Sequence, residues 1–158
     1  LVPPGLFREI EYAAYRVETG EYHSKQHAPV RRRASSDSLY RRNLKEGVDP
    51  EALYYWLFPN LMLNLYPDNL QTNVILPLGP DRTLTRFEWF VSDEDRPGLE
   101  EEFARSMAFS DEVQQEDIAI CEAVQRGLHS KAYRSGRYSV LRENGLHHFH
   151  GLLSRFLP

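Results

Sequence analysis

The stretch Leu61–Val91, LMLNLYPDNLQTNVILPLGPDRTLTRFEWFV, decides the fold. It contains three apolar segments with the two-residue alternation of half-buried β-strands, at Leu61–Tyr66, Thr72–Leu78 and Thr83–Val91. Two turn sequences separate them, Pro67-Asp68-Asn69 and Gly79-Pro80-Asp81. Strands joined by such short turns pair with their sequence neighbours, so the stretch predicts an antiparallel meander.

Helices are predicted after the meander, in three segments. The first begins at Asp95, with Pro97 in its first turn, and ends near Ala108. The second contains Gln114–Ser130, and the third covers Glu143–Leu157. One face of the third helix is apolar, at Leu146, Phe149, Leu153, Phe156 and Leu157. A run of strands followed by helices predicts a single α+β domain over residues 1–158.

Asp117 lies in the middle of an apolar stripe on the second predicted helix. The stripe consists of Val113, Ile120, Cys121, Val124 and Leu128, and Asp117 is four residues after Val113. This pattern predicts that Cys121 is a small buried side chain. It also turns the Asp117 carboxylate toward the core, where an ionised group is costly unless it is paired or binds a metal. A buried ion pair with an arginine and a metal ligand are therefore both open readings of Asp117.

Composition restricts the classes of function. A net charge of −4 argues against nucleic acid as the main partner. No apolar run approaches the roughly 18–20 residues that span a bilayer, and no signal peptide is evident. The basic segment Val30–Gly47 is predicted to be a solvated face, and docking of an acidic protein on it is the other reading. The single cysteine excludes an internal disulfide, which predicts a cytoplasmic protein. The lack of a spanning apolar run predicts that no membrane is a partner.

Two groups of histidines have spacings that also occur in metal sites. His23 and His27 are four residues apart, but a turn glycine and a proline bracket them, so a surface loop or strand is predicted. His147, His148 and His150 form the HHFH cluster of the last predicted helix. Structural histidines are favoured there over a zinc site, which would define an independent hydrolase.

Four ordered motifs resemble the catalytic domain of Rieske non-haem iron oxygenases, the alpha subunits of ring-hydroxylating oxygenases. They are YYWLFPNLMLNLYPDNL, VILPLGPDRTLTRFEWF, QEDIAICEAVQRGLHSKAYRSGRYS and ENGLHHFHGLL, and they extend from about Leu53 to Leu157. The resemblance implies a helix-grip fold of the START/Bet v 1 type, with a curved antiparallel sheet around a long C-terminal helix. It also implies mononuclear Fe(II) held by two histidines and one carboxylate. The carboxylate of the family's QED motif corresponds to Asp117, which becomes the predicted metal ligand and catalytic residue.

The sequence departs from the family in its upstream part. The motif that carries the two iron histidines, E-x-Y-H…H-P, is absent, and so is the Rieske [2Fe–2S] domain with its Cys₂His₂ ligands. We therefore expect a C-terminal part of a longer oxygenase that is inactive alone, although a natural truncation stays open. For the intact protein, the resemblance implies electrons from NAD(P)H through a separate reductase or ferredoxin, O₂ and an organic substrate, and a homotrimer.

The motifs define the substrate less closely than they define the family. The GLHS…GRYS…HHFH pattern resembles the branch of choline, carnitine and betaine monooxygenases most closely, while aromatic-ring substrates and a dioxygenase reaction stay open. Tyr54, Tyr55, Trp56 and Phe58 either line a pocket for a quaternary ammonium group through cation–π contacts or belong to the sheet core, which is favoured. A function of another class is a non-catalytic helix-grip module that holds a hydrophobic small molecule.

Overall fold

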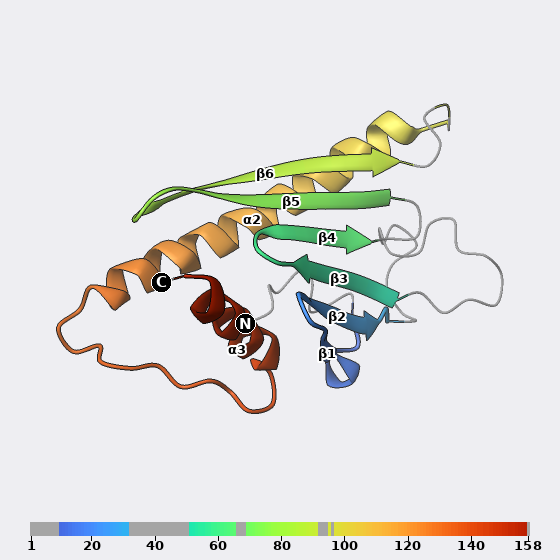
Figure 1. The fold of residues 1–158 in the computed structure, drawn as a ribbon. Helices are drawn as coiled ribbons and strands as arrows, with labels where there is room; N and C mark the ends of the chain where they lie inside the picture. Colours follow the sequence, from blue (N-terminus) through green and yellow to red (C-terminus); the bar gives the residue numbers. More distant parts are fainter. Residues whose placement is uncertain (1–9, 32–50, 66–68, 92–94, 96, 158) are drawn as a thin grey trace.

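A six-stranded antiparallel sheet followed by two helices makes up most of the fold (Figure 1). The computed structural model describes residues 10–31, 51–65, 69–91, 95 and 97–157. The strands are β1 (Arg16–Thr19), β2 (His23–Pro29), β3 (Glu51–Leu57), β4 (Leu61–Leu65), β5 (Asn69–Gly79) and β6 (Arg82–Val91). The 3₁₀-helix η1 (Tyr12–Ala14) precedes them, and α2 (Leu99–Leu128) and α3 (Asn144–Phe156) follow. This order confirms the predicted α+β class.

The predicted meander forms the second half of the sheet. Each strand pairs with the next one in sequence, so β4, β5 and β6 lie side by side in the order β4-β5-β6. The predicted turn at Gly79-Pro80-Asp81 joins β5 to β6. The turn predicted at Pro67-Asp68 and the basic segment from residue 32 to Gly47 lie outside the described residues.

Both helices cover the same face of the sheet. The strand register aligns four residues across β3 to β6: Trp56, Met62, Asn73 and Phe87. Directly paired residues point to the same side of an antiparallel sheet. Trp56 packs against Phe149 of α3 at 5.0 Å between ring centroids, and Trp89, on the Phe87 face of β6, packs against Phe103 of α2 at 6.1 Å. The two layers therefore meet along one mixed polar and aromatic interface.

One helix of 30 residues, α2, replaces the two helices predicted between Pro97 and Ser130. No glycine or proline lies between Ala108 and Asp117, so nothing in the sequence stops the helix there. In Figure 1, α2 crosses one face of the sheet diagonally, from the end of β6 toward the β5–β6 hairpin. No helix in the described part is long and apolar enough to cross a membrane.

The second half of α2 contradicts the predicted buried stripe. Cys121 is exposed, and the exposed fractions of Ile120, Val124 and Leu128 are 45%, 56% and 47%. Near this end, Gln125 Nε2 donates to Asp81 Oδ1 of the hairpin turn at 3.0 Å, so α2 has reached the tip of the hairpin. The stripe is exposed because this half of α2 extends beyond β3 and β4 and reaches only the β5–β6 hairpin (Figure 1).

The side of α3 that is buried also differs from the predicted apolar face. Leu152 is the buried residue of this helix, at 1% exposure, whereas Leu146 and Phe156 are 42% and 54% exposed. Gly145 sets the contact side, because a Cβ atom there would come within 3.0 Å of Val17 Cγ1 on β1. α3 has only 13 residues, so the long helix that follows the sheet is α2, with 30 residues.

A small apolar cluster closes the β1–β3 end of the sheet. Its buried members are Ile10, Ala28, Val30 and Ala52, and Tyr15 and Tyr54 pack against it. The Tyr15 phenol donates a hydrogen bond to Gln26 Oε1. Burial raises the pKa of Tyr15 to about 12, chiefly because the phenolate would lose hydration there.

Truncation of Leu152 tests the placement of α3. Leu152→Ala leaves a cavity at a site that is 1% exposed, so we expect a loss of about 2–5 kcal/mol in the free energy of unfolding. Leu141→Ala is the matched control, since Leu141 is 86% exposed and its truncation should change stability by no more than about 0.5 kcal/mol. Urea denaturation measures both, and equal effects would contradict the packing of α3.

The raised pKa of Tyr15 predicts that the folded protein loses stability at alkaline pH. The folded state keeps this phenol protonated to about pH 12, whereas a tyrosine in the unfolded chain titrates near pH 10. Stability should therefore fall as the pH rises from about 10 to 12, because the unfolded state releases its proton first. Tyr15→Phe should reduce this slope in urea denaturation, and Tyr133→Phe, at a residue that is 49% exposed, should leave it unchanged.

Candidate functional site

A chain of side-chain hydrogen bonds fixes α2 on the sheet. Asn64 Nδ2 on β4 donates to Gln71 Oε1 on β5 at 2.7 Å, and Gln71 Nε2 donates to Ser110 Oγ on α2 at 2.9 Å. Gln71 is only 5% exposed, so its amide depends on these partners. The bond to Ser110 therefore sets both the rotation of α2 and its position along the sheet.

Asp117 follows Ser110 by seven residues. Because seven residues are almost two helical turns, Asp117 lies on nearly the same side of α2 as Ser110, about 10.5 Å further along the axis. Asp117 is exposed in the described part of the chain, so the prediction that it is buried in the core is wrong. The surrounding chain still removes part of its hydration, and this desolvation raises the pKa of the Asp117 carboxyl.

No arginine in the described part of the chain forms an ion pair with Asp117. Asp117 makes no hydrogen bond or ion pair with another residue that the structure describes. A carboxylate that is partly desolvated and unpaired gains from a cation placed beside it. The residue therefore has the chemistry that one metal ligand needs, and the described part of the chain contains no group of three or more His, Cys, Asp or Glu side chains that could hold a metal ion.

A hollow of about 340 Å³ lies between β6 and the middle of α2. Its described lining residues are Phe87, Trp89, Met107, Ala108, Ser110, Asp111 and Gln114. The rings of Phe87 and Trp89 are 6.0 Å apart at an interplanar angle of 27°. The volume is within the range of about 300–1,000 Å³ that is usual for small-molecule sites.

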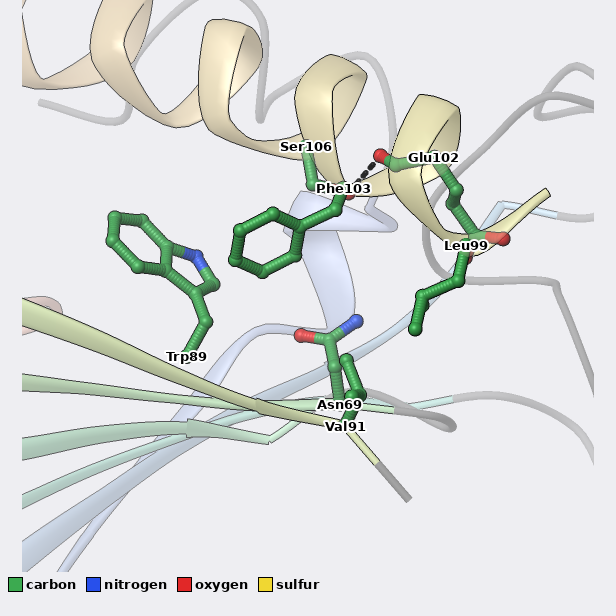
Figure 2. Close-up of a pocket in the computed structure, with 7 residues that line it drawn as sticks. All are labelled: Asn69, Trp89, Val91, Leu99, Glu102, Phe103 and Ser106. Carbon is green, nitrogen blue, oxygen red and sulfur yellow. Dashed lines mark hydrogen bonds between the residues drawn. The ribbon is translucent and has the colours of Figure 1, made fainter. Parts of the chain in front are cut away.

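Trp89 separates this hollow from a much smaller one toward the start of α2. Figure 2 shows the smaller hollow, where Leu99 and Phe103 point from the helix toward Asn69, Trp89 and Val91 on the sheet. Its volume is about 10 Å³, which is no more than one water molecule needs. Phe103 meets Trp89 edge to face at 80°, so aromatic packing closes this end of the helix–sheet interface.

The histidines have structural contacts. His27 on β2 lies 3.2 Å from Glu18 on β1, with Nε2 near Oε1. The Tyr138 hydroxyl lies 2.5 Å from His150 Nδ1, and its ring packs edge to face with His147 at 5.1 Å. His148 packs against Trp56, and its buried Nε2 has no partner within the described ranges. In the same ranges, no group of three or more His, Cys, Asp or Glu side chains is placed to hold a metal.

The aromatic residues in and just after β3 are half-buried, and three of them pack against other elements. Trp56 packs against Phe149, and Phe58 against Phe156, both on α3. Tyr54 packs against the Ile10 cluster. These contacts favour the core reading of Tyr54, Trp56 and Phe58, and the pocket reading stays a prediction that the described residues do not test. The hollow at Phe87 and Trp89 was missed because the sequence does not reveal where α2 crosses β6.

The match to known families agrees with this architecture. Residues 7–158 match the family described as ring hydroxylating alpha subunit (catalytic domain). The chain belongs to this family. The resemblance stated from the motifs is confirmed, and it extends further upstream than those motifs do.

Relatives within the family place the chain more finely. It is 46% identical over 115 residues to a chloroplastic choline monooxygenase of Arabidopsis thaliana, covering 69% of this chain and 26% of that protein. It is 32% identical over 120 residues to the carnitine monooxygenase oxygenase subunit of Escherichia coli K12, covering 70% and 32%. The chain thus spans between a quarter and a third of the length of these curated relatives.

A solved structure shares the fold. It is that of a quaternary ammonium Rieske monooxygenase studied for carnitine oxidation by gut microbiota. The TM-score is 0.81 at 23% sequence identity, and the match covers 99% of this chain and 43% of the other.

Removal of the Ser110 hydroxyl tests the link between α2 and the sheet. Ser110→Ala leaves the buried Gln71 amide without its acceptor, so we expect a loss of about 1–3 kcal/mol in the free energy of unfolding. Ser154→Ala is the control, because its exposed hydroxyl bonds only to the His150 carbonyl of its own helix at 2.9 Å. A Ser110→Ala variant as stable as the control in urea denaturation would show that the link is unimportant.

Proposed function

We propose that this chain is the part of a Rieske-type monooxygenase that supplies the carboxylate ligand of the mononuclear iron and one wall of the substrate site. The observation that carries the proposal is Asp117. It is partly desolvated, has no partner among the described residues, and stands at the acid of the QED motif in a chain that matches the family over residues 7–158.

The proposal requires ligands from outside the described residues. Two histidines would complete the iron site, and His23, His27 and the HHFH cluster are engaged elsewhere or lie on other elements. A Rieske [2Fe–2S] cluster needs two cysteines and two histidines, whereas this sequence contains one cysteine. This chain spans 26% and 32% of the choline and carnitine monooxygenase relatives, so we place these groups in the rest of a longer chain.

The residues of this chain have three tasks in the proposed reaction. Asn64, Gln71 and Ser110 hold α2 in register, which positions the Asp117 carboxylate. Asp117 provides negative charge for the iron, and bound Fe(II) would supply the activation of O₂. The aromatic wall at Phe87 and Trp89 keeps water from the substrate beside it.

The relatives support a quaternary ammonium compound as substrate and a monooxygenase reaction. The relatives compared above are named for choline and carnitine, and a third, from Chromohalobacter salexigens, is named for glycine betaine at 31% identity. An aromatic-ring substrate, and with it a role in aromatic hydrocarbon catabolism, finds no support among them. A separate reductase or ferredoxin using NAD(P)H belongs to the proposal, as does a homotrimer, since the solved relative is described with electron transfer between subunits.

The helix-grip arrangement is also part of the proposal. It is supported by two helices on one face of a six-stranded antiparallel sheet, although the long helix is α2 and not α3. The cytoplasmic location stays a prediction, because the Arabidopsis relative is named as chloroplastic.

Replacement of Asp117 tests the iron assignment. In the full-length protein, Asp117→Ala should lose the mononuclear iron and product formation, while the absorption and EPR signals of the [2Fe–2S] cluster persist. Metal analysis should show a decrease that corresponds to one iron per subunit. Glu122→Gln, at an exposed carboxylate five residues further along α2, should keep full iron content.

Two results would contradict the proposal. One is an Asp117→Ala protein with unchanged iron content and turnover. The other is a full-length protein that binds neither iron nor a [2Fe–2S] cluster, which would fit a non-catalytic module that holds a small molecule.

A further inference from the structure

We propose that the segment between α2 and α3, residues 129–143, is the docking surface for an acidic iron–sulfur protein that delivers electrons to the oxygenase. The inference rests on the proposed function, which requires a separate electron donor. It adds a surface for that donor, and the charge that the donor should have, which neither the family match nor the names of the relatives assign.

The segment 129–143 projects from the domain. In Figure 1 it leaves the end of α2 and forms a wide loop away from the sheet before α3 begins. Val140 and Leu141 are 94% and 86% exposed, and Tyr133 is 49% exposed. Connections longer than about 12–15 residues without helix or strand are uncommon in compact domains and are usually functional when ordered. Two adjacent aliphatic side chains in water are available to a partner.

A tight turn presents Val140 and its neighbour. The Ser139 carbonyl accepts hydrogen bonds from the backbone N–H groups of Arg142 and Glu143 at 3.3 and 3.0 Å. Arg142 also donates to the Tyr15 carbonyl at 3.3 Å, and its guanidinium carbon lies 4.6 Å from the centre of the Tyr12 ring. The turn is therefore fixed to the domain, so docking on it would cost little conformational entropy.

Three cations precede the turn. Lys131, Arg134 and Arg137 are exposed, and none of them forms an ion pair with another residue that the structure describes. The chain as a whole has a net charge of −4, so the sign of this segment is opposite to that of the rest. A cluster of like charges steers an oppositely charged surface toward it and raises the association rate. The partner is therefore expected to be acidic.

The composition of the segment fits a transient contact better than a permanent one. Permanent subunit interfaces are large and apolar, and charged residues are depleted from their centres. Here two aliphatic side chains lie beside a group of cations that would have to be desolvated together. Electron-transfer encounters bury small areas, below about 1,200 Å² in total, and use charge for recognition.

The proposed reaction needs a transient partner of this kind. Insertion of one oxygen atom of O₂ into a C–H bond, with reduction of the other atom to water, consumes two electrons and two protons. NAD(P)H supplies the electron pair, and a [2Fe–2S] protein carries one electron at a time. Such a protein must dock and leave twice in each turnover, so fast association and weak binding are both required.

Stopped-flow reduction of the [2Fe–2S] cluster in the full-length protein tests the surface. The probe is an acidic plant-type [2Fe–2S] ferredoxin, kept reduced by NADPH and its own reductase. Dithionite is the comparison, because a small reductant needs no docking surface. Arg134→Glu/Arg137→Glu should lower the second-order rate constant with ferredoxin by about tenfold or more at low salt, and should abolish its decrease with added salt. Reduction by dithionite should stay within about twofold of the wild type.

A matched variant controls for net charge. Arg86→Glu/Arg105→Glu makes the same change in charge at exposed residues of β6 and α2, and it should keep the wild-type rate constant with ferredoxin to within about twofold. Val140→Ser/Leu141→Ser removes apolar contact and no charge. It should lower the rate constant about fivefold and keep its salt dependence.

The outcomes separate this inference from the proposed function. Equal rate constants for the two charge variants would overturn the docking surface even if Asp117→Ala loses its iron. A wild-type cluster that dithionite reduces and ferredoxin does not would also overturn it. Dissociation of the Arg134→Glu/Arg137→Glu protein in size-exclusion chromatography would assign the segment to a contact between subunits instead. A full-length protein without a [2Fe–2S] cluster would contradict the proposed function and this inference together.

Discussion

The hydrogen bond from Gln71 to Ser110 is the contact on which the arrangement of the site depends. It joins a buried amide of the sheet to the middle of a 30-residue helix, and Asn64 holds the other side of the same amide. A helix is rigid over two turns, so fixing Ser110 also fixes Asp111 next to it and Asp117 seven residues later. The sheet needs no direct contact with either carboxylate.

This arrangement explains why polar groups are buried in the layer that would otherwise be apolar. Gln71 is 5% exposed on the face that both helices cover, and its amide has partners on both sides. Asn73 is 7% exposed on the same face, and its buried Oδ1 has no hydrogen-bond partner among the described residues. A purely aliphatic interface would allow α2 to slide or rotate with little cost, whereas an amide that must keep its partner permits one register. Phe87 and Trp89 flank this polar line and provide the wall of the hollow.

The sequence predicted local elements well and their contacts poorly. The meander followed from alternation and turn residues between Leu61 and Val91, because strand pairing across short turns is a local property. The extent of α2 was wrong, since the two predicted helices are continuous through Phe109 and Ser110. The predicted burial of Cys121 was wrong for a different reason: periodicity shows which residues share a side of a helix, but not whether the sheet extends far enough to cover that side.

The assignment of Asp117 came from the QED motif. The structure places this residue on α2, and its role as a ligand stays a prediction. The hollow at Trp89 and Asp111 joins residues 22 positions apart, and no pattern in the sequence brings them together.

The most direct test is a crystal structure of the full-length protein with choline, recorded with anomalous data at the iron absorption edge. We predict one iron peak bound to the Asp117 carboxylate, separate from the peaks of the [2Fe–2S] cluster. An iron peak at a site that excludes Asp117, or a structure in which Asp117 has an arginine as its partner, would contradict the account.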